Sequence, residues 1–258
     1  MATIERLTDE SRIVVAGHRG YKAAYPENTL LAFEEALKRG VDMLEFDLRM
    51  SKDGVTVVIH DDTVDRTTDG TGSVNELTLA ELKRLDAGGW FGRSFEGLRI
   101  PTFAELCELM AAYPDTLLNV EIKPSEQARA IADKVVPMLE ASGLLARCVF
   151  TCFDAGIIAY LHEVHGVKTQ GFPAALMSNF EHGEAGTYAK MWAVGLPMKL
   201  LTSELVAQMR SLGLLAWCYC PDDEEQVDYA LSCGVSLMTV NDILPALRRR
   251  ASDRIAAV

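Results

Sequence analysis

Three carboxylates stand in two short apolar segments of the first half of the chain, and each segment is typical of a β-strand. Side chains of a strand alternate between two faces, so Glu45 and Asp47 share one face, and Glu121 shares a face with Lys123. A strand face that carries acids is poorly suited to a dry core. Carboxylates that converge where strands end are instead the ligands that Mg2+ and Ca2+ prefer.

Two histidines follow the same pattern, because His18 and His60 each end a predicted strand. A pair of histidines beside a metal ion can pass protons during phosphoryl transfer. Arg19 follows His18 and can hold two phosphate oxygens at once, while Lys123 adds a point charge. Which histidine acts as the acid and which as the base stays open at this point.

The motifs that contain these residues resemble the glycerophosphodiester phosphodiesterase family. They are HRG at 18–20, PENT at 26–29, E-x-D at Glu45 and Asp47, KDGVTVVIHDDTVDRTTDGTG at 52–72, and E-x-K at Glu121 and Lys123. The motifs cover roughly the first half of the chain, and their combination is far more specific than any one of them.

The resemblance implies a metal-dependent hydrolase that cleaves a small phosphodiester, such as glycerophosphocholine or glycerophosphoethanolamine, to sn-glycerol 3-phosphate and an alcohol. By analogy, a neighbouring glycerol hydroxyl attacks phosphorus first, and water then opens a cyclic phosphate. One divalent cation, Mg2+ or Ca2+, would bind the three acids, and His18 and His60 would move protons. The substrate would contact four side chains, which are Arg19, Lys123, Phe153 and Trp217.

Other positions are less well determined by the resemblance. Glu27 would orient His18 or Arg19, or else support the turn around Pro26. The residues CYC at 218–220 and VNDI at 240–243 depart from the family's Thr-Val-Asn and Thr-Asp-x-Pro. These positions should contact the alcohol group, so the preferred head group stays open. We expect His182, in the loop at 173–186, to be exposed.

Three alternatives remain at the level of sequence. A lysophospholipase D-like activity would need an apolar groove near 176–180. A non-catalytic barrel that binds phosphodiesters is less consistent with a chain in which every matched catalytic position is filled. Dehydration of a sugar acid would leave the two histidines unexplained and would need a basic lysine that the strand ends lack.

Composition limits the partners of the chain. A net charge of -12 argues against nucleic acid and against stable association with an anionic membrane. The sequence at 1–12 has no signal-peptide pattern and no long apolar segment follows, so we expect a cytoplasmic protein. Six cysteines in 258 residues predict reduced thiols rather than a disulfide framework. A homo-oligomer stays open.

Apolar β-rich segments alternate with helical ones, which predicts an α/β fold, the (β/α)8 TIM barrel, as a single domain over 1–258. The expected strands are 13–17, 43–48, 117–122, 148–153, 168–172, 191–194, 214–219 and 236–240. Clear helices are 30–39, 103–112, 127–142, 155–165, 203–212 and 224–233, whereas the fifth and eighth are less clear.

The connection after the second strand is too long for an ordinary loop, so a small cap insertion is expected at 51–100, with a short strand at 55–59. We expect Asn28 to cap the first helix, with Thr29 opening it. Strand alternation predicts that the cysteines at 148, 152, 218 and 220 pack under the outer helices.

Overall fold

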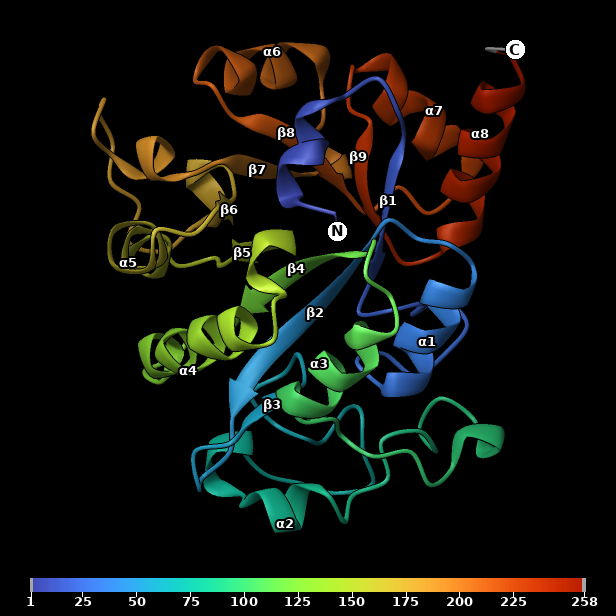
Figure 1. Cartoon of the computed structure of the whole chain (residues 1–258), viewed down its shortest axis with the longest axis vertical. Coiled ribbons are helices and arrows are strands. Elements are labelled where there is room, and N and C mark those ends of the chain that lie inside the picture. Colours follow the sequence, from blue (N-terminus) through green and yellow to red (C-terminus); the bar gives the residue numbers. More distant parts are fainter. Residues whose placement is uncertain (1, 257–258) are drawn as a thin grey trace.

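A computed structural model describes residues 2–256. Within these residues, nine strands form one sheet. Because β3 pairs antiparallel with β2, eight parallel strands remain, and the pairing of β1 with β2 closes them into a barrel. The predicted (β/α)8 barrel is therefore confirmed (Figure 1). Its strands are β1 (Val14–His18), β2 (Met43–Met50), β4 (Leu117–Ile122), β5 (Cys148–Thr151), β6 (Thr169–Gly171), β7 (Ala193–Pro197), β8 (Leu215–Tyr219) and β9 (Leu237–Val240).

The helices surround the strands on the outside of the barrel (Figure 1). They are α1 (Leu30–Lys38), α3 (Phe103–Ala111), α4 (Ala128–Ala141), α5 (Ala155–His165), α6 (Ser203–Ser211), α7 (Glu224–Ser232) and α8 (Ile243–Ala256). Between β6 and β7, where the sequence pattern was weak, the structure has two 3-10 turns, Ala174–Leu176 and Thr187–Lys190. The last helix, also weak in sequence, is present as α8.

The cap of α1 differs from the prediction. Thr29 is the N-cap, and its hydroxyl accepts a hydrogen bond from the backbone N–H of Ala32 at 3.2 Å. Asn28 has a positive φ of 56°, a left-handed conformation that asparagine tolerates better than most residues. This backbone turns the Asn28 side chain toward Asp47, where its Nδ2 donates to Oδ2 at 2.8 Å. The prediction was wrong because Asn28 supports a strand-end acid instead of the helix.

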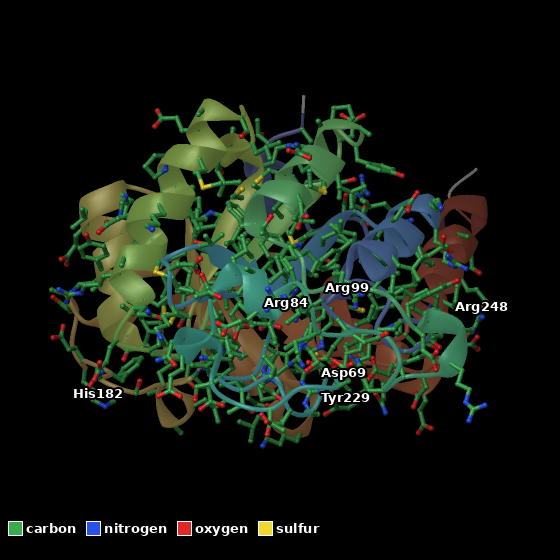
Figure 2. All side chains as sticks on the ribbon, turned by 90° about the horizontal axis from the view of Figure 1, so that it is seen from below. Asp69, Arg84, Arg99, His182, Tyr229 and Arg248 are labelled. Atoms are coloured by element: carbon green, nitrogen blue, oxygen red, sulfur yellow. The ribbon has the colours of Figure 1, made fainter. Side chains whose placement is uncertain are left out.

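The segment between β2 and α3 has structure of its own. It contains β3 (Thr56–Val58) and the short helix α2 (Leu79–Leu82), and buries a small apolar cluster that includes Val64, Leu82 and Ile100. Figure 1 shows it in teal, beyond the C-terminal end of β2. Asp69, Arg84 and Arg99 of this segment are labelled in Figure 2, which looks at the molecule from that side.

The barrel interior changes from apolar to polar along its axis. An apolar cluster at one end packs Met43, Leu117, Trp217 and Leu237 against Leu7 of the N-terminal 3-10 turn (Ile4–Thr8). Two residues further along these strands, the same face carries Glu45, Asn119, Tyr219 and Thr239, which line a pocket. The polar side chains of the interior therefore lie at the C-terminal ends of the strands, where TIM barrels have their active sites.

The cysteines follow the prediction with one exception. All six are free, and Cys148, Cys152 and Cys218 are buried behind the strands. Cys220 lies instead beside His18, with its Sγ 3.6 Å from the ring Nδ1. The prediction for Cys220 was wrong because β8 ends at Tyr219, and the alternation of strand faces does not continue past that end. None of the described helices is long and apolar enough to cross a membrane.

Candidate active site

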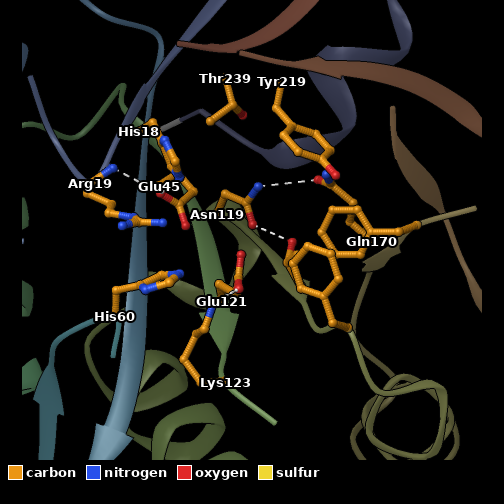
Figure 3. A pocket seen from close by; sticks show the side chains of 13 residues that line it. His18, Arg19, Glu45, His60, Asn119, Glu121, Lys123, Gln170, Tyr219 and Thr239 are labelled. Carbon is orange, nitrogen blue, oxygen red and sulfur yellow. Dashed lines mark hydrogen bonds and ion pairs between the residues drawn. The ribbon is translucent and has the colours of Figure 1, made fainter. Parts of the chain in front are cut away.

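A pocket of about 150 Å3 opens at the C-terminal ends of the strands (Figure 3). Its wall contains both predicted catalytic histidines, two of the three predicted metal ligands and three of the four predicted substrate contacts. The lining residues are His18, Arg19, Glu45, His60, Asn119, Glu121, Lys123, Thr151, Phe153, Gln170, Phe172, Tyr219 and Thr239. The third acid, Asp47, is buried beside Glu45 and Glu121 of this wall.

Strand register brings the acids together. Glu121 of β4 lies opposite Asp47 of β2, and His18 of β1 lies opposite Glu45 of β2. One carboxylate oxygen from each of Glu45, Asp47 and Glu121 lies within 4.8 Å of the others, and all three residues are buried. Adjacent strands are therefore enough to assemble an oxygen-only cluster of the kind that hard divalent cations prefer.

The protonation of these acids reflects their crowding. Burial, followed by repulsion from Asp47 and Glu121, raises the pKa of Glu45 well above its usual value, and burial also raises the pKa of Glu121. Burial disfavours the charge of Asp47 too, but Lys123 and Arg19 outweigh it and lower the pKa of that carboxyl. Glu45 and Glu121 would thus bind protons in the absence of a neutralising cation.

Two buried carboxylate oxygens of the cluster are available as ligands of a cation. Glu45 Oε1 and Asp47 Oδ1 have no hydrogen-bond partner among the described residues, and only Asp47 Oδ1 has a cation near it, Lys123 Nζ at 3.5 Å. Buried carboxylate oxygens without a hydrogen bond are destabilising unless a charge compensates them. The donor set, the shared location and the unpaired oxygens together fit one hard divalent cation held by Glu45, Asp47 and Glu121.

Arg19 connects this cluster to Glu27. Its Nε lies 3.1 Å from Asp47 Oδ2, and its Nη1 donates to Glu27 Oε1 at 2.8 Å. These contacts involve two of the three guanidinium nitrogens, and no described residue bonds Nη2, which is therefore available to a ligand in the pocket. The backbone N–H of Arg19 also donates to Glu45 Oε2 at 2.9 Å. Glu27 therefore contacts Arg19, one of the two partners that the sequence allowed for it.

His18 faces the acids with one ring nitrogen, since its Nε2 lies 3.8 Å from Glu45 Oε2. Burial and then the charge of Arg19 lower the pKa of His18 from 6.5 to about 3. The imidazole is therefore neutral at ordinary pH in the absence of a bound anion, and a neutral ring has one nitrogen free to accept a proton.

His60 does not end a strand as predicted, because β3 ends at Val58 and His60 lies in the bend that follows. Asp61 and Arg66 hold its ring in place. Its Nδ1 lies 2.6 Å from Asp61 Oδ1, and Arg66 Nε donates to Asp61 Oδ2 at 2.6 Å. Arg66 also donates to both carboxylate oxygens of Glu27, at 2.8 and 3.1 Å. Burial lowers the pKa of His60.

Asp61 and Arg66 were not singled out by the sequence analysis. Both stand inside the segment 52–72 that carries the family resemblance, and an acid directly after a predicted catalytic histidine was the available signal. Their contact could not be read from spacing, because it depends on how the segment folds back against Glu27.

An aromatic wall stands opposite the histidines. Phe153 and Phe172 stack with ring centroids 3.6 Å apart, and the ring of Tyr219 meets Phe172 edge-on at 5.6 Å. Lys123 Nζ lies 5.7 Å from the centre of the Phe153 ring and donates to Glu121 Oε1 at 2.5 Å. The predicted contacts Phe153 and Lys123 therefore lie together in the pocket.

Trp217 does not share this position. It is fully buried in the apolar end of the barrel, and its Nε1 donates to Thr239 Oγ1 at 2.9 Å. Tyr219, two residues later on the same strand face, occupies the wall that the sequence analysis expected of Trp217. His182 is exposed, and Figure 2 shows it at the periphery of the molecule.

Asn119, Thr151 and Gln170 form a buried polar floor that the sequence analysis also missed. The hydroxyl of Thr151 donates to Asn119 Oδ1 at 2.5 Å, and Asn119 Nδ2 donates to Gln170 Oε1 at 3.3 Å (Figure 3). Inward alternation on β4, which places Asn119 on the face of Glu121, was the available signal.

We expect Glu27→Gln to lower the free energy of unfolding by about 3 kcal/mol at pH 7. Burial disfavours the charge of Glu27, but Arg66 and Arg19 outweigh it and lower its pKa from 4.5 to about 2. The ionised form is thus favoured by folding above pH 4.5, and this contribution disappears as pH falls toward 2. Urea unfolding at several pH values should show the difference from wild type shrinking across that window.

Glu34→Gln is the matched control for Glu27→Gln. Glu34, in α1, also carries a carboxylate that forms an ion pair, here with Lys38. This pair lies on the surface and contributes little to the free energy of unfolding. A Glu27→Gln difference that stays constant down to pH 2 would contradict the assigned ion pairs.

Comparison with known proteins places these features in a family. Residues 18–244 match the Glycerophosphoryl diester phosphodiesterase family. The chain is 42% identical over 241 residues to a glycerophosphodiester phosphodiesterase of Caldanaerobacter subterraneus subsp. tengcongensis, an alignment that covers 90% of this chain and 95% of that protein. It is 30% identical over 254 residues to a glycerophosphodiester phosphodiesterase of Bacillus subtilis, with 91% and 85% of the two chains covered.

A solved structure agrees with these alignments. The crystal structure of a glycerophosphodiester phosphodiesterase from Agrobacterium tumefaciens superposes with a TM-score of 0.76 at 25% sequence identity. The superposition covers 91% of this chain and 98% of that one. The resemblance that the first half of the sequence indicated therefore extends over nearly the whole chain.

Proposed function

The chain belongs to the glycerophosphodiester phosphodiesterase family of enzymes, and from this premise we propose that it hydrolyses small glycerophosphodiesters to sn-glycerol 3-phosphate and an alcohol. Glycerophosphocholine and glycerophosphoethanolamine are the substrates we propose first. The observation that carries this proposal is one pocket that contains His18, His60 and Arg19 against a buried cluster of three acids. The cytoplasmic location stays a prediction from the sequence.

The charge of the site supports a phosphodiester. Three clustered carboxylates face two cations, Arg19 and Lys123. The adjoining carboxylates of Glu27 and Asp61 are balanced by Arg66 and Lys22. One negative charge remains, and a divalent cation would turn it into one positive charge. That charge matches the single negative charge of a phosphodiester, so the loaded site would attract the substrate over a chain that is negative overall.

Glu45, Asp47 and Glu121 would hold the cation, for which we propose Mg2+ or Ca2+ on the basis of oxygen-only ligands. When bound, it supplies positive charge that stabilises the charge developing on the phosphate oxygens. Arg19 supplies further donors to the same oxygens through its remaining nitrogen. We propose that Lys123 and Phe153 border the bound substrate, as their place in the pocket allows.

The histidines would carry the protons. One accepts the proton of the attacking hydroxyl, for which we propose the substrate's own neighbouring glycerol hydroxyl, and the other protonates the leaving alcohol. A small cyclic phosphate would form and then be opened by water with the same two groups. The segment 51–100 would serve as a cap whose fold holds His60 at the pocket through Asp61 and Arg66.

A substrate panel tests the proposed function directly. We expect release of sn-glycerol 3-phosphate from glycerophosphocholine and glycerophosphoethanolamine, and little turnover of the 2-deoxy analogue of glycerophosphocholine, because it lacks the attacking hydroxyl. Lysophosphatidylcholine, assayed below and above its micellar concentration, tests the lysophospholipase D alternative. Preference for the micellar lipid, or failure to cleave any glycerophosphodiester with Mg2+ or Ca2+ present, would contradict the proposal.

A further inference from the structure

The ring nitrogen of His18 that faces away from the acids is held by residues from the other end of the chain. Its Nδ1 lies 2.6 Å from Oδ1 of Asn241, which directly follows β9. Asn241 is held in turn by Asp222, which lies in the loop after β8. Neither residue lines the pocket among the residues described for it, so both would act through His18.

Asp222 determines which way the Asn241 amide points. Asn241 Nδ2 donates to Asp222 Oδ2 at 2.6 Å, and the backbone N–H of Asn241 donates to Asp222 Oδ1 at 2.7 Å. A carboxylate only accepts hydrogen bonds, so the NH2 group of the amide must face Asp222 and the carbonyl oxygen must face His18. The flipped amide would set two acceptors against each other.

The direction of the amide then determines the proton on the ring. An amide oxygen only accepts, so Nδ1 of His18 must carry the hydrogen. The neutral ring has a single N–H, and its lone pair is therefore on Nε2, the nitrogen that lies 3.8 Å from Glu45 Oε2. Cys220 Sγ, 3.6 Å from the same Nδ1, is the weaker and longer contact.

We propose that Asn241 and Asp222 are positioning residues that hold His18 in the Nδ1–H tautomer, with its unprotonated Nε2 directed into the pocket. The proposal rests on the proposed function in one respect, namely that His18 takes a proton during turnover. His60 has a different partner, because its Nδ1 meets the carboxylate of Asp61 rather than a neutral amide. The Nδ1 atoms of the two histidines therefore bond to different kinds of acceptor, a neutral amide for His18 and a carboxylate for His60.

The tautomer can be observed without turnover. The chain has only five histidines, so long-range 1H–15N correlation spectra of 15N-labelled protein can be assigned with a His18→Gln variant. We expect His18 of the wild-type protein to be protonated on Nδ1, both without metal and with Mg2+. A wild-type spectrum with the proton on Nε2 would overturn the proposal.

Variants separate positioning from folding. Asn241→Leu removes the acceptor at similar volume, and we expect it to lose the Nδ1–H form and to lower kcat about 10-fold to 100-fold with little change in KM. The double variant Asn241→Asp with Asp222→Asn exchanges the two groups, so residue 241 still accepts from Nδ1 and residue 222 now donates to residue 241. It should restore both the tautomer and most of kcat. An Asn241→Leu protein that keeps the wild-type tautomer would also overturn the proposal.

A second variant and a control complete the test. Asp222→Ala leaves Asn241 in place but frees its amide to rotate, so it should mix the two tautomers even if Asn241→Leu fails to fold. Asp242→Asn changes a neighbouring carboxylate that bonds Tyr21 and not His18, and should leave the His18 spectrum unchanged. If the wild-type protein cleaved no glycerophosphodiester but showed the Nδ1–H form, the proposed hydrolase function would be contradicted, whereas the proposed roles of Asn241 and Asp222 would be supported.

Discussion

Replacing His60 with alanine is expected to lower kcat by about 100-fold to 10,000-fold, and replacing His18 is expected to do the same. Both rings line the pocket, on either side of Arg19 in Figure 3, and general acid or base catalysis is worth this much in typical enzymes. The measurement is steady-state release of sn-glycerol 3-phosphate from glycerophosphocholine at saturating metal.

Folding must be shown to survive these substitutions. His60 is only half-buried, and truncating a partly exposed side chain usually changes stability little, so the melting temperature of His60→Ala should stay close to that of wild type. His162→Ala, on the exposed face of α5, is the matched control and should retain full turnover. A His60→Ala enzyme within about threefold of wild type, far less than a lost acid or base requires, would remove His60 from the mechanism.

Removing the divalent cation should abolish turnover, and Glu45→Gln should weaken cation binding even where the fold is intact. Excess EDTA tests the first statement, with activity restored by adding back Mg2+ or Ca2+. Calorimetric titration and thermal melts test the second independently of activity, because a ligand present at about 100 times its dissociation constant stabilises the native state by roughly 2.7 kcal/mol.

The stability of Glu45→Gln without metal is a second expected result. It distinguishes a variant that has lost a metal-binding carboxylate from one that has failed to fold. Burial, Asp47 and Glu121 raise the pKa of Glu45, so folding of the metal-free protein at neutral pH must either bury its charge or take up a proton, and both lower the stability. Glutamine has a similar shape and no charge, and the metal-free variant should be at least as stable as wild type. We expect it to lose the stabilisation by Mg2+ that wild type shows.

The control for this experiment is Glu76→Gln, which changes an exposed carboxylate that belongs neither to the acid cluster nor to the pocket lining. It should bind the cation and respond to EDTA as wild type does. Full activity of the wild-type enzyme in excess EDTA, or an unchanged cation affinity in Glu45→Gln, would contradict the metal site.

The sequence determined the parts of this protein that depend on short-range periodicity. Strand side chains alternate with a period of two, so Glu45 and Asp47 had to share a face, and Glu121 had to share one with Lys123. Alternation of strands with helices likewise limited the fold to an α/β parallel sheet, because each parallel connection must cross outside the sheet. The count of eight strands and the family resemblance favoured the closed barrel. The three predicted ligands and His18 needed no long-range information beyond the convergence of strand ends, whereas His60 reaches the pocket only through the fold of the segment after β3.

Depth within the barrel was decided only by the tertiary structure. Trp217 and Tyr219 lie on one face of β8, and the sequence cannot say which of them reaches the pocket. That choice depends on the stagger of hydrogen-bond register from strand to strand, which is a property of the whole closed sheet. The stagger places Trp217 in the apolar end and Tyr219 at the aromatic wall.

The partners of the catalytic groups were also decided by tertiary structure. His18 and Asn241 are 223 positions apart and meet only because β9 returns beside β1 when the barrel closes. Arg66 reaches Glu27 because the segment after β3 folds back on the loop before α1. Side-chain periodicity says which face a residue takes, whereas loops have no such period, so their contacts depend on the assembled barrel.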